Sequence, residues 1–525
     1  MKRPIASILA VVLSVAALAA DDVPAARYVS FLASDRAARH RQMTNEAFRA
    51  EAAKGGTPPP GSVPYLPRWE RAAKNMRDLG GWKAMDGQRI RFGRLYRASV
   101  HPREKGKDPA PRLARLGVRT ELDLRDPAKD AKPFGTNLVY VTLGTTAPAY
   151  VGAFSDKGRP LVRRMFDVLL DEANYPIVFH CSQGADRTGT LAALVELLMG
   201  VSEDDVSRDW QLTAFHNPNP KFRDAERYDR FIAQLASYPG ADFRAKTQAF
   251  LRTCGLTDAD FAKLRGMLLE RPVMSFGFVS DTHVTGERSR GRGKGRPNDG
   301  FPKALDRFRS VGVDAVVNAG DLTEGGNLEE VGLYADMFAA AFPSNPPPHF
   351  CVWGNHDVLD ASYMRAMDLS AECAQSIPTN HAEVCRRLDG FVHDPASAWS
   401  RLIGGVWFVG VDWKHEAAAL PELERTAVRA AGRPFFLVQH NPGATPELKA
   451  FLARHPNCVR LGGHNHMRLD RPCPVVVRGN GRIELLGGST DAHASVVRVW
   501  PDCVTVERRD LRDGHALPDL VLPAR

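Results

Sequence analysis

The sequence predicts an α/β protein built from two consecutive domains. Its 525 residues are too many for one ordinary hydrophobic core, so two or three domains are expected. Between residues 68 and 270, apolar segments of strand type alternate with segments of helical spacing. Near Pro272 the alternation starts again, with apolar runs that each end in polar residues. Alternation of this kind is typical of sheets covered by helices, with functional residues at the carboxyl ends of the strands.

The first 20 residues have the layout of a secretory signal peptide. Lys2 and Arg3 precede an apolar core over residues 5–17, and small residues follow. This order predicts export, to the periplasm or out of the cell, with an uncleaved membrane anchor as the alternative. Residues 21–67 are expected to form one or two helices and then a linker rich in Gly and Pro.

The charge of the chain favours anionic partners without identifying one. The formal net charge is +9 at neutral pH, which suits phosphorylated or otherwise acidic substrates. The sequence contains no zinc finger, helix-turn-helix or aromatic RNA-binding motif, so no specific nucleic-acid binding is predicted. Nothing in the sequence indicates the oligomeric state.

The first domain is assigned to residues 68–270. Its expected strands cover residues 89–96, 118–124, 138–143 and 175–179, and its expected helices cover residues 110–116, 159–172 and 190–199. Residues 175–179 form a short apolar run and residues 118–124 alternate in the manner of a strand, whereas residues 159–172 and 190–199 have helical spacing. The loop that leaves the last of these strands is therefore expected to carry function.

That loop reads His-Cys-Ser-Gln-Gly-Ala-Asp-Arg-Thr-Gly, with five residues between Cys181 and Arg187. A loop of this length can surround a phosphate with backbone N–H groups at the positive end of the next helix. Both features stabilise a thiolate, so the Cys181 sulfur is expected to be a nucleophile at neutral pH. Arg187 offers a planar fork that matches two phosphate oxygens. The alternative is a buried cysteine beside a structural arginine.

The loop resembles that of the cysteine-dependent protein tyrosine phosphatases. Its G-x-D-R-T-G ending is similar to the bacterial branch that includes lipid- and dual-specificity phosphatases. The stretches Asn75–Gly81, which reads N-x-R-D-L-G-G, and Gly93–Arg97 are similar to the same branch. The resemblance covers about residues 60–270, and it implies catalysis through a phosphocysteine intermediate.

A phosphocysteine mechanism also needs an acid that protonates the leaving oxygen. Asp186 lies inside the loop, where similar bacterial enzymes place an Asp, and Asp126 follows the expected central strand. Both carboxyl groups remain candidates. Thr188 is expected to bond the sulfur when it becomes the leaving group. Arg77 and Asp78 are expected to support the loop.

The second domain is assigned to residues 272–525. Five apolar runs end in Ser280–His283, Gly320–Thr323, Gly354–Asp357, His440–Asn441 and Gly462–His466. Carboxylates and imidazoles in this order favour divalent ions of the Mn, Fe or Zn class. Two ions about 4 Å apart can clamp a phosphate and convert a bridging water into hydroxide. The tail from residue 483 to residue 511 alternates enough to form two or three antiparallel strands that close a second sheet.

This motif set resembles the calcineurin-like metallophosphoesterases over about residues 272–500. The resemblance implies a sandwich of two mixed sheets, and it assigns one metal to Asp281, His283 and His466. It assigns the other metal to Asn355, His440 and His464, with Asp321 as the bridge. It further implies that His356 protonates the leaving oxygen or stabilises the phosphoryl charge, and that Asp357 orients that imidazole.

Two further features of this domain concern its subgroup and its surface. Purple acid phosphatases place a Tyr three residues after the bridging Asp, but this chain has Glu324, so an iron–tyrosinate site is not expected. A basic run of alternate residues is formed by Arg288, Arg290, Arg292, Lys294 and Arg296. This run is either a solvated loop or a contact for anionic surfaces.

The sequence thus predicts an exported bifunctional phosphatase with two unrelated phosphoester-cleaving sites. The expected substrate is a phosphorylated small molecule, a phospholipid headgroup or a phosphoprotein. In the alternative interpretation only one domain is catalytic, and the other binds phosphorylated ligands.

Overall fold

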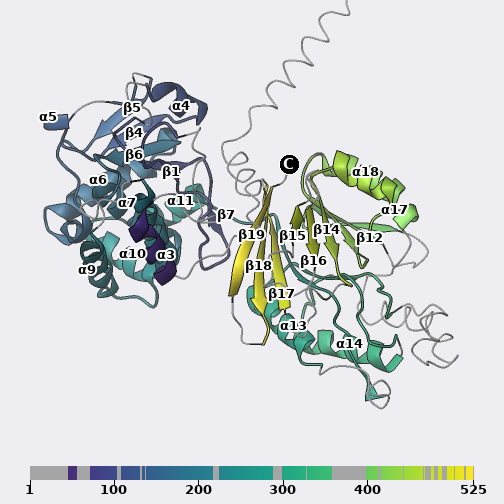
Figure 1. Ribbon diagram of the computed structural model, residues 1–525. Helices are drawn as coiled ribbons and strands as arrows, with labels where there is room; N and C mark the ends of the chain where they lie inside the picture. The colour runs from purple at the N-terminus through teal and green to yellow at the C-terminus, as the bar shows by residue number, and fades with distance from the viewer. Residues whose placement is uncertain are drawn as a thin grey trace, which may run out of the picture. The chain divides into compact units, whose positions relative to one another are not determined.

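The computed structural model divides into two compact units, one containing Met43–Arg271 and the other containing Pro272–Arg525 (Figure 1). It describes residues 45–55, 71–102, 108–130, 133–135, 137–216, 224–287, 298–326, 328–357, 398–411, 416–441, 443–464, 466, 475–477, 483–486, 493–501, 503–512 and 516–523. The predicted signal peptide and the basic run at residues 288–296 lie outside the described residues. Among the helices described, none is long and apolar enough to cross a membrane.

The first unit is built on a five-stranded sheet in the order β1-β3-β6-β4-β5. Its strands are β1 (Arg77–Asp78), β3 (Leu95–Ser99), β4 (Thr120–Asp123), β5 (Val139–Thr142) and β6 (Ile177–Cys181). β1 pairs antiparallel with β3, and the other pairs are parallel. A separate antiparallel pair joins β2 (Arg89–Ile90) to β7 (Leu269–Glu270). The parallel pairs bring the carboxyl ends of β3, β6, β4 and β5 to one edge of the sheet.

Helices cover this sheet and enclose α7. The helices are α3 (Asn45–Lys54), α4 (Ala110–Arg115), α5 (Pro127–Asp130), α6 (Gly158–Leu170), α7 (Asp186–Met199), α8 (Glu203–Gln211), α9 (Ala225–Ala236), α10 (Phe243–Thr253) and α11 (Asp258–Leu268). Short 3-10 turns are η1 (Tyr150–Phe154), η2 (Glu172–Asn174) and η3 (Leu212–Phe215). Every residue of α7 from Thr188 to Met199 is buried. A helix that is apolar on all sides is a core helix, so α7 fixes the loop before it rigidly.

The expected elements of this unit are found, with shifted ends. The predicted strand over 89–96 is divided, because a turn containing Gly93, with φ +71°, separates β2 from β3. The helix predicted to begin at residue 190 begins at Asp186, four residues earlier. Apolar periodicity marks only the part of a helix that faces a core, so the polar first turn of α7 was missed. Asp186 and Arg187 therefore lie on a helix and not in an open loop.

The second unit contains two six-stranded mixed sheets. The first has the order β10-β9-β8-β17-β18-β19, with β8 (Met274–Val279), β9 (Ala315–Asn318), β10 (His349–Cys351), β17 (His493–Val499), β18 (Cys503–Asp510) and β19 (Ala516–Pro523). The second has the order β11-β12-β13-β14-β16-β15, with β11 (Trp399–Ile403), β12 (Val406–Val411), β13 (Phe435–Gln439), β14 (Cys458–Gly462), β15 (Val475–Val477) and β16 (Ile483–Leu486).

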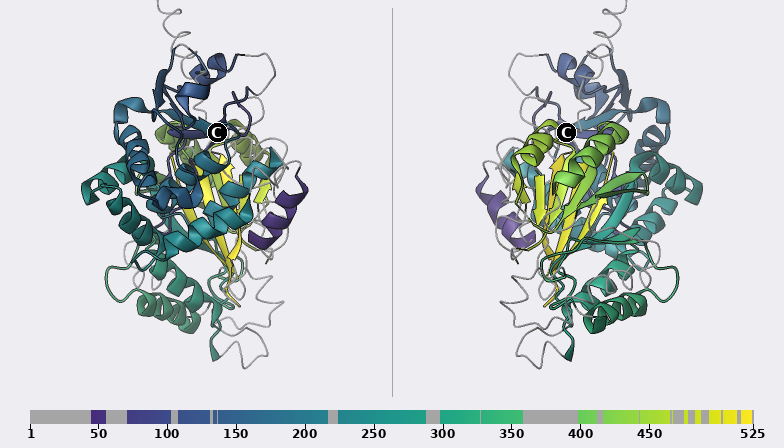
Figure 2. Two further views of the ribbon diagram at one scale, coloured as in Figure 1. Left: turned by 90° about the vertical axis from the view of Figure 1, so that its left-hand side faces the viewer. Right: turned by 90° about the vertical axis from the view of Figure 1, so that its right-hand side faces the viewer.

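The two sheets pack face to face around an aromatic core. The ring of Phe276 in the first sheet lies 5.2 Å from that of Phe408 and 5.0 Å from that of Phe436 in the second. Helices α13 (Gly300–Val311) and α14 (Leu328–Ala341) cover the outer face of the first sheet. Helices α17 (Glu416–Ala430) and α18 (Pro446–Arg454) cover the second, as the right-hand view of Figure 2 shows. The predicted sandwich of two mixed sheets is confirmed.

Candidate active sites

The loop after β6 meets the requirements of a phosphate cradle. β6 is the middle strand of its sheet and ends at Cys181, and α7 begins at Asp186. The chain turns at Gly184, which has φ +68°, and a Cβ there would lie 2.5 Å from the backbone oxygen of Ala98. Only glycine fits this position without displacing β3. Cys181 is 2% exposed, and it lies before the N-terminal end of α7.

Arg187 and Thr188 lie in the first turn of α7. Arg187 donates from Nη2 to the hydroxyl of Ser182 at 3.2 Å and from Nη1 to that of Thr146 at 3.1 Å. The hydroxyl of Thr188 is buried and has no hydrogen-bond partner among the described residues. A buried hydroxyl without a partner is costly, so its presence here suits a ligand or a reacting group at this loop.

A buried polar network holds the loop from behind. Asn75 donates from Nδ2 to the backbone oxygens of Gln183 and Gly184, both at 3.0 Å. Arg97 donates to the same oxygen of Gly184 at 3.0 Å. Arg77 donates to Asn75 Oδ1 at 2.7 Å and to Asp209 Oδ1 at 2.8 Å. The stretch that begins at Asn75 therefore supports the loop through Asn75 and Arg77.

Asp78 has a different task from the one expected. Its two oxygens accept hydrogen bonds from the backbone N–H groups of Gly80 and Gly93, each at 2.7 Å, and it thus holds two turns beside β1 and β3. Burial raises the pKa of Asp78 to about 7, although both hydrogen bonds oppose the rise.

The raised pKa of Asp78 predicts a pH-dependent stability. An unfolded Asp ionises near pH 4, so the folded unit should lose a few kcal/mol of stability as pH rises from about 4 to about 7. Asp78→Asn should remove this loss, although it weakens one backbone hydrogen bond. In urea unfolding, the free energy of unfolding of the variant should therefore rise relative to that of the wild type between pH 4.5 and pH 7. Asp86→Asn is the control, because Arg265 lowers the pKa of Asp86 against the effect of burial. Parallel pH profiles for wild type and Asp78→Asn would contradict the assignment.

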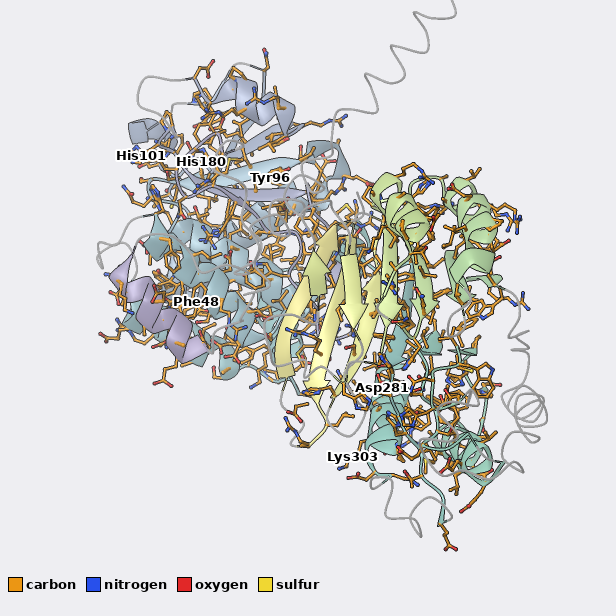
Figure 3. The ribbon with its side chains drawn as sticks, turned by 45° about the vertical axis from the view of Figure 1, so that its right-hand side comes forward. Phe48, Tyr96, His101, His180, Asp281 and Lys303 are labelled. Carbon is orange, nitrogen blue, oxygen red and sulfur yellow. The ribbon has the colours of Figure 1, made fainter. Side chains whose placement is uncertain are left out.

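His180, marked in Figure 3, forms a buried pair that the sequence did not indicate. Its Nε2 lies 2.8 Å from Glu121 Oε1, and both side chains are fully buried. The other oxygen of Glu121 accepts the N–H of Phe134 at 2.7 Å. The pair fixes the residue next to the nucleophile, and its available signal was a glutamate in the middle of the predicted strand that becomes the buried β4.

The two candidate acids, Asp186 and Asp126, have different surroundings in the structure. Asp186 is half-buried in the first turn of α7, and its Oδ1 accepts a hydrogen bond from the hydroxyl of Tyr150 at 2.8 Å. Burial raises the pKa of Asp186, while this hydrogen bond opposes the rise. Asp126 lies just before α5, where it accepts the N–H of Ala128 at 3.1 Å.

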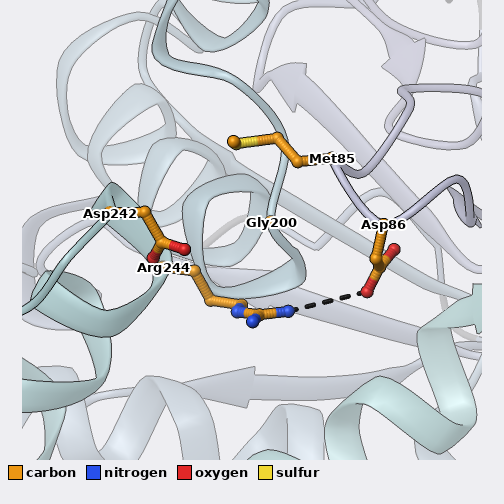
Figure 4. Close-up of a pocket in the computed structure, with 5 residues that line it drawn as sticks. All are labelled: Met85, Asp86, Gly200, Asp242 and Arg244. Carbon is orange, nitrogen blue, oxygen red and sulfur yellow. Dashed lines mark ion pairs between the residues drawn. The ribbon is translucent and has the colours of Figure 1, made fainter. Parts of the chain in front are cut away.

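An open pocket of about 220 Å³ lies elsewhere in this unit (Figure 4). It is lined by Met85, Asp86, Gly200, Asp242 and Arg244. Gly200 ends α7, a helix about 21 Å long, so the pocket is at the opposite end from Cys181. It is therefore distinct from the phosphate cradle.

In the second unit, each predicted metal ligand follows the carboxyl end of a strand. Asp281 and His283 follow β8, Asp321 follows β9, Asn355 follows β10, His440 follows β13, and His464 and His466 follow β14. Figure 3 marks Asp281 beside this edge of the first sheet. The predicted ligands are thus gathered from five strands of two sheets.

The donor atoms of these residues converge into two groups with one shared member. The first group is Asp281, His283, Asp321 and His466, and the second contains Asp321, His440 and His464. In the first group, Nε2 of His283 and Nε2 of His466 are 3.0 Å apart. In the second, Nε2 of His440 lies 3.1 Å from Asp321 Oδ2 and 3.2 Å from Asn355 Oδ1. The donor set, carboxylate and amide oxygens with imidazoles, fits two divalent ions that share Asp321.

The backbone at this centre is strained. Five of the seven predicted ligands have positive φ, namely Asp281, His283, Asp321, His464 and His466. Each such residue costs about 1–3 kcal/mol, and such strain persists where the surrounding structure imposes it, as in binding sites. The fold thus maintains the convergence of these side chains at a cost in stability.

His356 and Asp357 take different positions from those expected of a dyad. Nδ1 of His356 lies 2.8 Å from the backbone oxygen of Glu324, which therefore orients this imidazole. Asp357 accepts hydrogen bonds from the N–H groups of Leu322, Thr323 and Gly354 and from the Thr323 hydroxyl, at 2.9 to 3.0 Å. Asp357 therefore ties the loop of Asp321 to the loop of Asn355 and does not orient the imidazole.

Glu324 contacts two histidines of the site, His283 and His356. Its Oε2 lies 3.1 Å from Nδ1 of the metal-ligand candidate His283, on the side of the ring away from His466. A carboxylate behind a histidine ligand fixes the ring and raises its basicity. The role of Glu324 behind His283 was not predicted, and the available signal in the sequence is its position three residues after Asp321.

Comparison with known proteins agrees with both sites. Residues 70–270 match the tyrosine phosphatase family, and residues 274–468 match the calcineurin-like phosphoesterases. A candidate tyrosine-protein phosphatase of Cupriavidus necator is 30% identical over 161 residues, which are 25% of this chain and 57% of that protein. The chain thus matches little more than half the length of this curated relative.

Two solved structures are among those similar to parts of the chain. A dimetal phosphatase from Danio rerio is 15% identical, with 48% of this chain and 100% of that chain covered and a TM-score of 0.32. The core catalytic domain of a PP-IP phosphatase from S. cerevisiae is 22% identical, with 32% and 93% covered and a TM-score of 0.22.

The family matches agree with the chemistry of the residues brought together in each unit. The second match indicates the use of divalent metal, in keeping with the donor groups around Asp321. The chain is thus similar to the tyrosine phosphatase family over residues 70–270 and to the calcineurin-like phosphoesterases over residues 274–468.

Proposed function

We propose that this chain hydrolyses phosphoesters at two chemically independent sites. The observation that supports this most directly is that each unit has, at the carboxyl ends of its strands, a group of side chains able to bind and cleave a phosphoester. Cys181, Arg187 and the Thr188 hydroxyl, which has no hydrogen-bond partner within the described part of the chain, lie at the loop between β6 and α7. Two donor groups that share Asp321 form the other set. The coexistence of both sets argues against the alternative in which one unit only binds phosphorylated ligands.

In the first unit, the Cys181 thiolate attacks phosphorus and forms a sulfur–phosphorus bond while the bond to the leaving oxygen breaks. Arg187 and the N–H groups of the loop stabilise the charge on the equatorial oxygens. An acid protonates the leaving oxygen. Water then attacks phosphorus, and the electron pair of the breaking bond returns to sulfur, where the Thr188 hydroxyl donates a hydrogen bond.

In the second unit, Asp281, His283 and His466 would hold one divalent ion of the Mn, Fe or Zn class, and Asn355, His440 and His464 the other. When bound, such a pair supplies an activated water and a clamp for the phosphoryl oxygens. Asp321, which is common to both donor groups, would help to hold both ions. His356 would donate a proton or a hydrogen bond to the substrate from Nε2, and the hydrogen-bond distance from its Nδ1 to the Glu324 carbonyl supports this role.

The proposal extends to location and substrate class. Export through the N-terminal segment would place both sites outside the cytoplasm. A phosphorylated small molecule, a phospholipid headgroup or a phosphoprotein would satisfy either site. One chemical logic for the pair is sequential, in which the metal site cleaves a diester and the cysteine site removes the remaining monoester.

The test is phosphate release from a panel of mono- and diesters by wild type, Cys181→Ser and Asp321→Asn, each with and without a chelator. Cys181→Ser should abolish a chelator-resistant activity and leave the chelator-sensitive one. Asp321→Asn should do the reverse, since the shared carboxylate belongs to both donor groups.

The outcomes separate the two interpretations. Loss of both activities on chelation would contradict a metal-independent cysteine site. Wild-type rates for either variant on every substrate, under both conditions, would assign that unit to binding and reject the proposal of two catalytic sites.

A further inference from the structure

Tyr150 has an unusual backbone for a buried tyrosine. It begins η1 with φ +50°, and it is 3% exposed. A residue other than glycine in this region costs about 1–3 kcal/mol, and it persists only where its surroundings hold it there.

The contacts of Tyr150 converge on the first turn of α7. Its backbone N–H donates to the Thr190 hydroxyl at 2.7 Å, and that hydroxyl donates to the backbone oxygen of Asp186 at 2.8 Å. Its own hydroxyl donates to Asp186 Oδ1 at 2.8 Å and accepts the indole N–H of Trp210 at 3.2 Å. Both the main chain and the side chain of Tyr150 thus fix the residue that lies next to Arg187.

We infer that Tyr150 is a positioning residue that presents Asp186, rather than Asp126, as the acid of the phosphocysteine step. This inference rests on the function proposed for the first unit. Because Asp186 Oδ1 accepts the hydrogen bond from the Tyr150 hydroxyl, the acidic proton of Asp186 is assigned to Oδ2. The carboxylate of Asp126 instead caps the N–H of Ala128 in its own turn.

The proton balance follows from this arrangement. As Cys181 attacks, the electron pair of the breaking phosphorus–oxygen bond goes to the leaving oxygen, which takes the proton from Asp186 Oδ2. Asp186 is then a carboxylate. In the second step it takes a proton from the attacking water, and the sulfur leaves as thiolate.

The surroundings of Asp186 set the sign of a pH effect. Burial raises its pKa, and the hydroxyl of Tyr150, Arg227 on α9 and Arg187 on its own helix lower it, while Asp224 at the start of α9 raises it. Removal of the Tyr150 hydroxyl therefore raises the pKa of Asp186. Since the acid must be protonated, the basic limb of the kcat profile should move to higher pH.

The test uses the full chain with Asp321→Asn, in the presence of a chelator, so that only the cysteine site works. Tyr150→Phe is compared on p-nitrophenyl phosphate, whose leaving group needs little protonation, and on phenyl phosphate, whose leaving group needs more. We expect kcat to fall about 10-fold on phenyl phosphate and less than about 2-fold on p-nitrophenyl phosphate, with KM unchanged. A merely structural tyrosine would lower both rates alike.

Three further variants complete the test. Asp186→Asn should reproduce the leaving-group pattern at larger amplitude, and adding Tyr150→Phe to it should change little, because both act through one proton. Asp126→Asn should show no such pattern. Equal losses on both substrates, additivity with Asp186→Asn, or the pattern appearing in Asp126→Asn would overturn the inference. Activity that survives Cys181→Ser in the same background would instead reject the proposed function.

Discussion

Asp209→Asn should lower the free energy of unfolding by about 3–5 kcal/mol, because it removes the carboxylate charge that two buried guanidinium groups bind. Asp209 on α8 is fully buried, and its carboxylate binds Arg77 at 2.8 Å and Arg97 through the other oxygen. Its backbone oxygen accepts a second hydrogen bond from Arg77 at 2.8 Å. Arg97 in turn holds the backbone oxygen of Gly184 in the phosphate loop. The chelator-resistant activity should fall with the stability.

Asp204→Asn is the matched control for this prediction. Asp204 lies on the same helix and undergoes the same change, but it is exposed. Loss of its charge from the helix N-terminal turn should cost less than about 1 kcal/mol. Urea unfolding and phosphate release in chelator measure both variants. Equal stability for the two variants would show that the buried network does not hold the first unit together.

Much of each site could be predicted from the sequence because it lies in short, contiguous stretches. The loop from His180 to Gly189 contains its own nucleophile, glycine turn and arginine, so spacing alone indicated a phosphate cradle. The ligands of the second unit follow apolar strands directly, and parallel strands bring their carboxyl ends to one edge. The predicted fold class, two α/β units with a sandwich in the second, is confirmed.

What the sequence could not indicate depends on contacts between distant segments. Tyr150 reaches Asp186 across 36 positions, and Glu121 reaches His180 across 59. Such contacts depend on how distant segments align and pack in the folded chain, and no local pattern of residues encodes that alignment. The tail illustrates the same limit: β16 at residues 483–486 pairs parallel with β14 in one sheet, whereas β17 and β18 pair antiparallel in the other. The prediction of antiparallel strands that close one sheet is thus confirmed for β17 and β18 and wrong for β16, which joins the other sheet.

Gly354→Ala should disable the metal site without removing any ligand. A Cβ at Gly354 would lie 2.1 Å from Asp321 Oδ1 and 2.4 Å from the backbone nitrogen of Asp321. Because the second of these atoms is backbone, the clash can be relieved only by moving the loop that carries the shared carboxylate. The N–H of Gly354 also donates to Asp357 at 3.0 Å, so the tie between the two loops should loosen. Metal affinity should fall about 10- to 100-fold, as it does when groups that orient ligands are displaced.

Metal content after dialysis against graded Mn²⁺ measures this effect independently of activity, and phosphate release without chelator measures its consequence. The chelator-resistant activity should stay at the wild-type level, because the substitution lies in the other unit. Gly266→Ala is the control. Gly266 lies within α11 with open space at its Cβ position, so alanine there should stabilise the first unit by about 0.5–1 kcal/mol and leave metal content unchanged. Wild-type metal affinity for Gly354→Ala would contradict this prediction. It would mean that the two loops can move apart without loss of the ions, and that the strained backbone at Asp321 is not needed to hold them.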